Sequence, residues 1–189
     1  MFWKKVLCCA MIMLCLSGCG KSDKLKQQPL ELRTALLEKG GCSFQADITV
    51  DFPDRAYDFS VTCDYHSGEY AKITVLSPDE IAGIAAKVSG SGASVEFDDV
   101  ALDFGQLANG NVSAMEAAWL LAKCWDSAYI SAAGKDGEFL RVTYLEGYGD
   151  GQLTVDTWLN EAGEPVRGEI AYDGMRCLTL EITQFQLNT

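Results

Sequence analysis

Histidine is nearly absent from this chain of 189 residues, which has one, and the motifs of common catalytic sites are missing altogether. His66 lies in a turn-forming stretch between Tyr65 and Glu69, a setting typical of a solvated surface residue. No nucleophile elbow, phosphate-binding glycine loop or zinc-protease helix is present. The cysteines form neither a CxxC pair nor a cluster with histidine, which disfavours zinc. We therefore expect no catalytic residue, no metal and no cofactor.

Positive charge is also scarce. The chain has 15 lysines and arginines against 27 aspartates and glutamates, and its net charge is −12. A nucleic-acid partner is therefore excluded, because phosphate binding requires a basic surface. Lys21, Lys24 and Lys26 are the exception near the N-terminus. They have two interpretations: attraction to anionic lipid headgroups, or a solvated polar linker.

No apolar run is long enough to span a membrane. The run Val6–Leu16 follows Lys4 and Lys5 and is shorter than the roughly 20 residues that a bilayer core requires. It is typical of a secretory signal. The quartet LSGC that ends at Cys19 resembles a bacterial lipobox, which implies a diacylglyceryl group on this cysteine and removal of residues 1–18. The alternative is an ordinary cleaved signal or an uncleaved anchor.

The domain organisation follows from this leader. We expect residues 19–28 to be the lipidated cysteine and a polar tether, and residues 29–189 to be a single domain. Loss of Lys4 and Lys5 with the signal makes the net charge of the mature chain −14. The predicted location is the cell envelope, on the extracytoplasmic face of the membrane that holds the lipid.

Four cysteines remain in the mature domain, and an exported compartment lets disulfides persist. They permit three pairings: the residues are Cys42, Cys63, Cys124 and Cys177. If Phe52 lies opposite Arg55, Cys42 and Cys63 are diagonal neighbours on one face of a hairpin, and a slip of two residues would set them directly opposite. A Cys42–Cys63 disulfide and two buried free thiols are both open, and Cys124–Cys177 would be the remaining pair.

The N-terminal half of the domain changes from a helical to a strand period. Residues 29–39 predict an amphipathic helix that ends at Gly40 and Gly41. Its expected apolar stripe comprises Leu30, Leu32, Ala35, Leu36 and Leu37. Residues 42–52 and 57–65 then alternate apolar and polar side chains, which predicts a long antiparallel hairpin around Pro53 and Asp54. Another strand follows over 71–75.

Short helices and strands complete the chain. Ser77, Pro78 and Glu80 predict one or two helical turns before Gly83, and Ser113 with Glu116 predicts a capping box that opens a second helix. The apolar face expected for that helix comprises Met115, Ala118, Trp119, Ala122 and Trp125. The further predicted strands are 84–88, 93–97, 100–104, one beginning at 129, 139–145, 153–159, 166–172 and 178–187.

About ten strands and two main helices predict a fold that is mainly β with some α. Helices are too few for alternating parallel units, so we expect a meandering antiparallel sheet. Because so many strands have one apolar face, the sheet must curl strongly, as an unclosed barrel with the helices covering its concave side.

At this level the chain resembles the lipoprotein-carrier superfamily of bacterial envelopes, the LolA, LolB, LppX and RseB-like proteins. The resemblance covers residues 30–187 and rests on the order of the leading helix, the hairpin FQADITVDFPDRAYDFSVTCDY, the segments YAKITVLSPDEIAGI and VEFDDVALDFG, and the helix beginning SAMEAAWLLAKCW. It implies an unclosed barrel around a hydrophobic cavity, a helical lid, and the binding of lipids or of acylated or unfolded proteins. A lipid anchor on Cys19 departs from the soluble carriers, because a tethered chain cannot diffuse away with cargo.

The residues expected around such a cavity come from the hairpin, the next strand and the second helix: Phe44, Phe59, Val61, Ile73, Met115, Trp119 and Trp125. They have two interpretations, the core of a solid domain or the wall and movable plug of a lipid-sized cavity. The first function hypothesis is therefore a non-catalytic, membrane-tethered module that binds a lipid, an acylated peptide or an apolar protein segment. The alternative is an envelope sensor or scaffold with a filled interior that acts through a protein partner.

Overall fold

A computed structural model describes residues 25–51, 56–90, 92–96, 106–107, 110 and 112–189. Several predictions lie outside these residues: the signal segment 1–18, Cys19, Lys21, Lys24, the Pro53–Asp54 turn and the strand over 100–104. In the described ranges, no helix is both long and apolar enough to cross a membrane.

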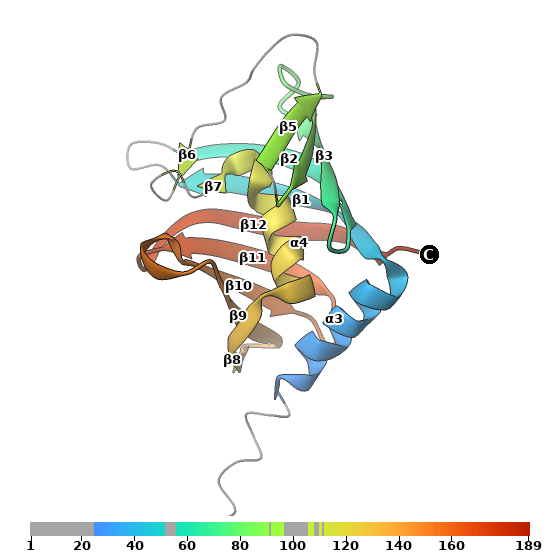
Figure 1. The fold of residues 1–189 in the computed structure, drawn as a ribbon, viewed down its shortest axis with the longest axis vertical. Helices are drawn as coiled ribbons and strands as arrows, with labels where there is room; N and C mark the ends of the chain where they lie inside the picture. Colours follow the sequence, from blue (N-terminus) through green and yellow to red (C-terminus); the bar gives the residue numbers. More distant parts are fainter. Residues whose placement is uncertain (1–24, 52–55, 91, 97–105, 108–109, 111) are drawn as a thin grey trace, which may run out of the picture.

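Ten strands form one antiparallel sheet in the order β5-β4-β3-β2-β1-β12-β11-β10-β9-β8 (Figure 1). Their bounds are β1 Gly41–Asp51, β2 Ala56–His66, β3 Tyr70–Ser77, β4 Ala85–Ser89, β5 Gly92–Glu96, β8 Tyr129–Asp136, β9 Phe139–Glu146, β10 Leu153–Leu159, β11 Pro165–Tyr172 and β12 Met175–Leu187. The sheet is strongly curved, and β5 and β8 end it without pairing with each other. The expected unclosed half-barrel is confirmed. A separate pair joins β6 (Gln106–Leu107) to β7 (Val112–Ser113).

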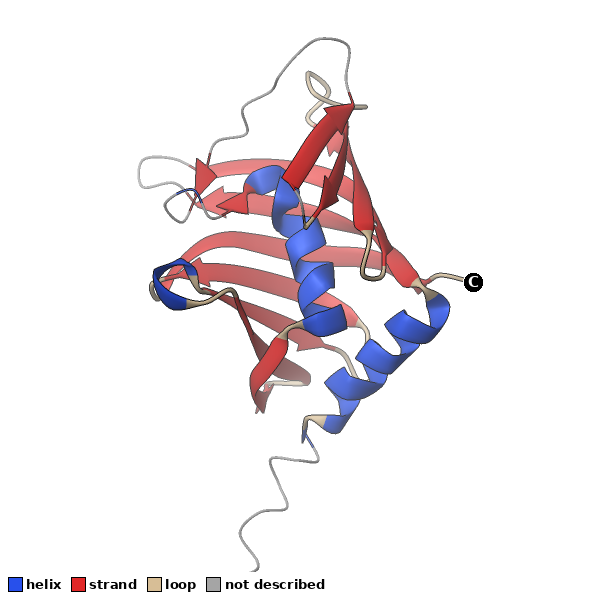
Figure 2. Cartoon of the chain, viewed as in Figure 1, coloured by secondary structure: helices blue, strands red, loops and turns tan. Residues whose placement is uncertain are grey.

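The two main helices lie on the concave side of this sheet, as Figure 2 shows. They are α3 (Gln27–Lys39) and α4 (Ala117–Ser127). Helix α4 crosses the hollow of the sheet and packs against β2, β3, β9 and β10, whereas α3 packs on α4, β1 and β12. A short 3-10 turn, η3 (Ala114–Glu116), leads into α4, and a second, η4 (Gly149–Gly151), joins β9 to β10.

The N-terminal hairpin has the first of its two expected registers, not the one shifted by two residues. Phe44 pairs with Cys63, and Cys42 pairs with Tyr65. Every second side chain of β1 is buried from Cys42 to Val50, because β1 is a central strand whose concave face meets the core while its outer face meets solvent.

The ends of both helices follow local rules. Gly40, with φ of 72°, adopts the left-handed conformation that ends α3, and its N–H donates to the carbonyl oxygen of Leu36. At the other helix, the N–H of Ser113 donates to Oε2 of Glu116 at 3.1 Å, which satisfies part of the predicted capping box.

Close packing of α4 on the sheet depends on Gly168 in β11. A Cβ atom at this position would lie 2.6 Å from Cδ2 of Leu121, a fully buried side chain on α4. A side chain here would therefore push the helix away from the strand.

Two local predictions were wrong. Residues 78–83 form a turn rather than helical turns, because the N–H of Val75 bonds to Ile84 and the N–H of Gly83 bonds back to Val75, so the chain reverses at once. The apolar stripe of α3 is also narrower than expected. Leu32 and Leu36 are buried, but Leu30 and Leu37 are 48% and 59% exposed, because only one edge of this helix meets the sheet and α4.

Candidate functional site

The side chains expected to surround a cavity are gathered in one core on the concave side of the sheet. Six of the seven are buried there: Phe44, Phe59, Val61, Ile73, Met115 and Trp125. The seventh, Trp119, is partly buried, and Nζ of Lys123 lies 5.1 Å from the centre of its ring. Whether these residues contact a ligand stays a prediction.

Trp125 is the central side chain of this core and is fully buried. Its ring lies 5.5 Å from that of Phe44 on β1 and 6.0 Å from that of Phe185 on β12, measured between centroids. Its Nε1 donates to Oγ1 of Thr157 on β10 at 2.9 Å. The indole therefore joins α4 to three strands, and the hydrogen bond satisfies the one polar atom that its burial would otherwise leave unpaired.

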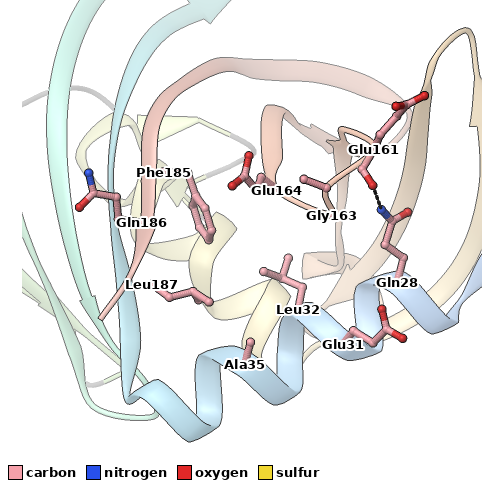
Figure 3. A pocket seen from close by; sticks show the side chains of 11 residues that line it. Gln28, Glu31, Leu32, Ala35, Glu161, Gly163, Glu164, Phe185, Gln186 and Leu187 are labelled. Carbon is pink, nitrogen blue, oxygen red and sulfur yellow. Dashed lines mark hydrogen bonds between the residues drawn. The ribbon is translucent and has the colours of Figure 1, made fainter. Parts of the chain in front are cut away.

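A cleft of about 430 Å³ opens beside this core, between α3, the turn from β10 to β11, and the end of β12 (Figure 3). Its apolar lining is Leu32, Ala35, Phe185 and Leu187. Because Phe185 also contacts the ring of Trp125, the floor of the cleft continues directly into the core. This volume lies in the range of small-molecule sites.

The polar lining of the cleft is acidic. Glu31, Glu161 and Glu164 contribute carboxylates, Gln28 and Gln186 contribute amides, and none of the lining residues is lysine or arginine. Apolar side chains thus form the floor and carboxylates the rim, an arrangement that accepts an apolar group and leaves its polar end in solvent.

One wall of the cleft is held by Gln28. Its Nε2 donates to the carbonyl oxygens of Asn160 at 3.1 Å and Glu161 at 3.4 Å, which ties the start of α3 to the β10–β11 turn (Figure 3). The turn is itself rigid, because Oδ1 of Asn160 accepts the N–H groups of Ala162 and Glu164 at 2.9 and 3.0 Å.

Arg33 holds the opposite side of α3. Its guanidinium donates to the carbonyl oxygens of Cys124, Trp125 and Ala128, at the C-terminal end of α4. The carbonyl oxygen of Cys124 also accepts the N–H of Ala128, and the helix dipole places partial negative charge at this end of α4, so a cation is favoured. Near the start of α3, Nζ of Lys26 donates to the carbonyl oxygen of Ile130 at 3.4 Å.

A buried polar pair lies at the other end of the core. Tyr65 donates its hydroxyl hydrogen to Oδ2 of Asp126 at 2.8 Å, and the N–H of Gly68 donates to the same oxygen at 3.2 Å. Burial, with the nearby carboxylate of Asp126, raises the pKa of Tyr65. The phenol is therefore a hydrogen-bond donor at any physiological pH, and it ties α4 to β2.

The structure joins none of the four cysteines of the described domain in a disulfide. Cys42 and Cys63 are buried free thiols at diagonal positions of the hairpin, which is one of the two alternatives for this pair. Burial raises the pKa of Cys42 to about 12, and it also raises the pKa of Cys63 and of Cys124. These thiols are poor nucleophiles, since the thiolate is the reactive form.

Side chains suited to metal binding are not gathered in the described part of the chain. No three histidine, cysteine, aspartate or glutamate side chains come together there as metal ligands. His66 is partly exposed, stacks on the ring of Tyr70 at 4.6 Å between centroids, and lies 3.5 Å from Asp64.

Sequence reasoning missed the cleft, because its lining comes from three segments far apart in the chain. The sequence indicates a chain reversal at Gly163 and places Phe185 in the last predicted strand. Neither fact indicates where α3 docks. Gly163 lies against Gln28, since a Cβ there would be 3.3 Å from Cγ of that side chain.

The protein is thus a half-barrel with helix α3 over one end of its concave side, next to the cleft (Figure 2). No protein-family model matches the chain, and no curated protein matches its sequence. Solved structures with a similar fold include a LolA superfamily protein from Nitrosomonas europaea, with 11% identity, coverage of 83% of this chain and 94% of that one, and a TM-score of 0.44.

Two further structures are similar at the same level. An uncharacterized conserved protein from Thermus thermophilus has 11% identity, coverage of 86% and 90%, and a TM-score of 0.42. A DUF1329 family protein from Desulfovibrio piger has 7% identity, coverage of 87% and 93%, and a TM-score of 0.38.

Proposed function

We propose that this chain is a non-catalytic, membrane-tethered lipoprotein that binds a hydrophobic ligand on the concave side of its half-barrel. The ligand is a lipid, an acylated peptide or an apolar protein segment. The single observation that carries this proposal is the cleft under α3, whose floor of Leu32, Phe185 and Leu187 reaches the ring of Trp125.

Energetics support α3 as a movable lid. Two leucines of this helix, Leu32 and Leu36, are buried, and their burial is worth about 1.5–3 kcal/mol each. Pro29 is buried as well, and the side chains of Gln28 and Arg33 add hydrogen bonds to carbonyl groups that water can replace. An acyl chain that buries about ten methylenes gains about 8 kcal/mol, which offsets displacement of the helix.

The anchor on Cys19 belongs to the same proposal. The leader and the LSGC quartet support a lipid at the start of the mature chain, and residues 20–26 connect that position to α3. Because α3 forms one wall of the cleft, the tether and the lid are consecutive in sequence. A ligand would therefore be received close to the membrane that holds the protein.

A pyrene-labelled diacylglycerol is a suitable probe, because it is uncharged and the acidic rim does not repel it. The Ala35→Trp variant fills the cleft, and Thr34→Trp adds the same ring to the neighbouring exposed position of α3. We expect Ala35→Trp to weaken binding by about tenfold or more and Thr34→Trp to bind as the unmodified chain does. Equal binding by all three proteins would show that this cleft takes no lipid.

A second function is favoured by a different observation. Trp125 is fully buried and fixed by its hydrogen bond to Thr157, as expected of a filled core rather than a plug. In that case the protein is an envelope sensor or scaffold that acts through a protein interface. It then binds no pyrene-labelled lipid at all, and a membrane-protein partner is recovered by crosslinking.

A further inference from the structure

Strand β8 leaves one side of its backbone open. It ends the ten-stranded sheet, and in the described ranges its one strand neighbour is β9 (Figure 1). In an antiparallel pair, alternate residues turn both N–H and C=O to the same side, so about half of the peptide groups of β8 point away from β9. Lys26 bonds to the carbonyl oxygen of Ile130 at the start of the strand. From Ser131 to Asp136, no described residue forms a hydrogen bond with the backbone groups that point away from β9.

The surface beside this edge is hollow. Ala132, Ala133 and Gly134 have small side chains or none, and with Arg141 and Thr143 of β9 they line a hollow of about 550 Å³. The floor is held in place, since Arg141 and Thr143 both bond to the carboxylate of the buried Asp156. A strand added to β8 would lay every second side chain over this hollow.

A second hollow, of about 530 Å³, lies at the end of the same strand. Its apolar lining is Phe139, Trp158 and Val166, and its carboxylates are Asp136, Glu138 and Glu181. Arg167 is the one cation among the lining residues, and it pairs with Glu169 through Nη2 and with Glu181 through Nε, at 3.6 Å. Trp158 is fixed by donating from Nε1 to Asp136 at 2.8 Å. The guanidinium groups of Arg141 and Arg167 lie 5.3 and 5.0 Å from the centre of the Trp158 ring. The carboxylate left to receive a further cation is Glu138, which suits the end of a lysine or arginine with an apolar stem.

The edge also carries features that oppose indiscriminate pairing. The register of β8 with β9 shifts between Ile130 and Ala132, a bulge at Ser131, and Lys135 is exposed near the far end. Bulges and edge lysines prevent a sheet from pairing with copies of itself. The occupant that remains is a segment of another protein with matching side chains, rather than a second copy of this chain.

We propose that the outer edge of β8, from Ser131 to Asp136, binds an extended segment of a partner protein by β-strand addition, with a lysine or arginine of that segment seated beside Asp136 and Glu138. About six residues, or roughly 20 Å of extended chain, match the open edge. The partner segment should carry small side chains where it passes Ala132–Gly134 and one cationic side chain at the end that lies beside Asp136. This interface is on the convex side and is separate from the cleft under α3.

The test uses residues 19–189 with Cys19→Ser and a capped six-residue peptide of alternating threonine and valine that ends in arginine. Backbone amide signals are followed by NMR. The matched control peptide has the same sequence with alternate backbone nitrogens methylated, so it cannot donate to a strand edge. We expect the first peptide to shift the signals of Ser131–Asp136 with a Kd tighter than about 1 mM, and the methylated one to shift none.

Two variants test the cationic end of the segment. Glu138→Lys, in the β8–β9 turn, should weaken binding by about 5-fold, whereas Glu161→Lys, in the β10–β11 turn, should leave it unchanged. The proposal would be overturned if neither peptide shifts any signal, if both peptides cause the same shifts, or if the shifts lie outside β8 and its neighbour β9. Equal effects of the two variants would also overturn it. Shifts in β8 that depend on protein concentration without peptide would assign the edge to a second copy instead.

Discussion

Arg33 on α3 donates a hydrogen bond from Nε to the carbonyl oxygen of Trp125 on α4, at 3.0 Å. The same guanidinium donates to Ala128 at 2.6 Å, so one side chain of the lid helix caps the helix that carries the central tryptophan. The position of α3 over the cleft and the end of α4 are therefore coupled. Any ligand that moves α3 must also break or rearrange these bonds.

Replacing this cation should loosen the lid. We expect Arg33→Met to lower the free energy of unfolding by about 2 kcal/mol, because several charge-assisted hydrogen bonds are lost and the last carbonyls of α4 lose their cap. Hydrogen exchange of the α3 amides should accelerate as well. The control is Arg176→Met, whose exposed pair with Asp51 is worth less than about 1 kcal/mol. Equal losses in the two variants would contradict the cap.

The contact between Leu121 on α4 and Gly168 on β11 predicts that a substitution of this glycine lowers the stability of the protein. Gly168→Ala should destabilise the protein by about 1–3 kcal/mol, because the added Cβ would lie 2.6 Å from Cδ2 of Leu121, a fully buried side chain that must then shift. Gly134→Ala is the matched control, since nothing lies within 4 Å of a Cβ there, and we expect its effect to stay within about 0.5 kcal/mol. Urea denaturation measures both. A Gly168→Ala protein as stable as the control would show that the contact is not tight.

Alkaline pH should destabilise the fold through its buried thiols. The pKa of Cys42 rises from 9.0 to about 12 on burial, so above pH 9 the unfolded chain releases a proton that the folded chain retains. The stability contributed by this thiol is complete below pH 9 and is lost as pH rises toward 12, at up to about 1.4 kcal/mol per pH unit. Burial shifts Cys63 and Cys124 in the same direction.

Urea denaturation at pH 8 and at pH 10.5 measures this slope, and Cys42→Ala should reduce it. A slope that Cys42→Ala leaves unchanged would mean that this thiol does not titrate between the two states. A mass short by two hydrogens in the exported protein, restored in both Cys42→Ala and Cys63→Ala, would mean that these two residues form a disulfide instead, which also removes the titration.

Lipid attachment has its own test. In a bacterial host, radiolabelled palmitate should be incorporated into the full chain and should be lost in Cys19→Ser, because the LSGC quartet makes this sulfur the acceptor. Cys15→Ser is the control, since that residue leaves with the signal and labelling should persist. Label retained in Cys19→Ser would exclude this cysteine as the site.

Much of the fold could be predicted from local patterns. Alternation along β1 and β2 predicted which side chains of the hairpin face the core, because a shift by one residue would turn every apolar side chain to solvent. It left open a slip of two residues, which the pairing of Phe44 with Cys63 excludes. The end of α3 at Gly40 was equally readable from sequence, since it depends on one residue in a left-handed conformation.

The cleft could not be predicted in the same way. Leu32 and Phe185 are brought together by the pairing of β1 with β12 and by the docking of α3, and no local pattern encodes the angle of a helix on a sheet. The exposure of Leu30 and Leu37 has the same cause, since helical period alone does not tell which part of an apolar stripe meets the core. The turn after Ser77 was mistaken for a helix because both begin with the same capping residues.

Native mass spectrometry tests the central claim most directly. The sample is residues 19–189 with Cys19→Ser, produced in the exported compartment and measured before and after mild denaturation. A half-barrel that holds a hydrophobic ligand should carry extra mass, of the size of a lipid or an acylated peptide, that leaves when the protein unfolds. A bare polypeptide mass under both conditions would contradict ligand binding and favour a filled domain that acts through a protein partner.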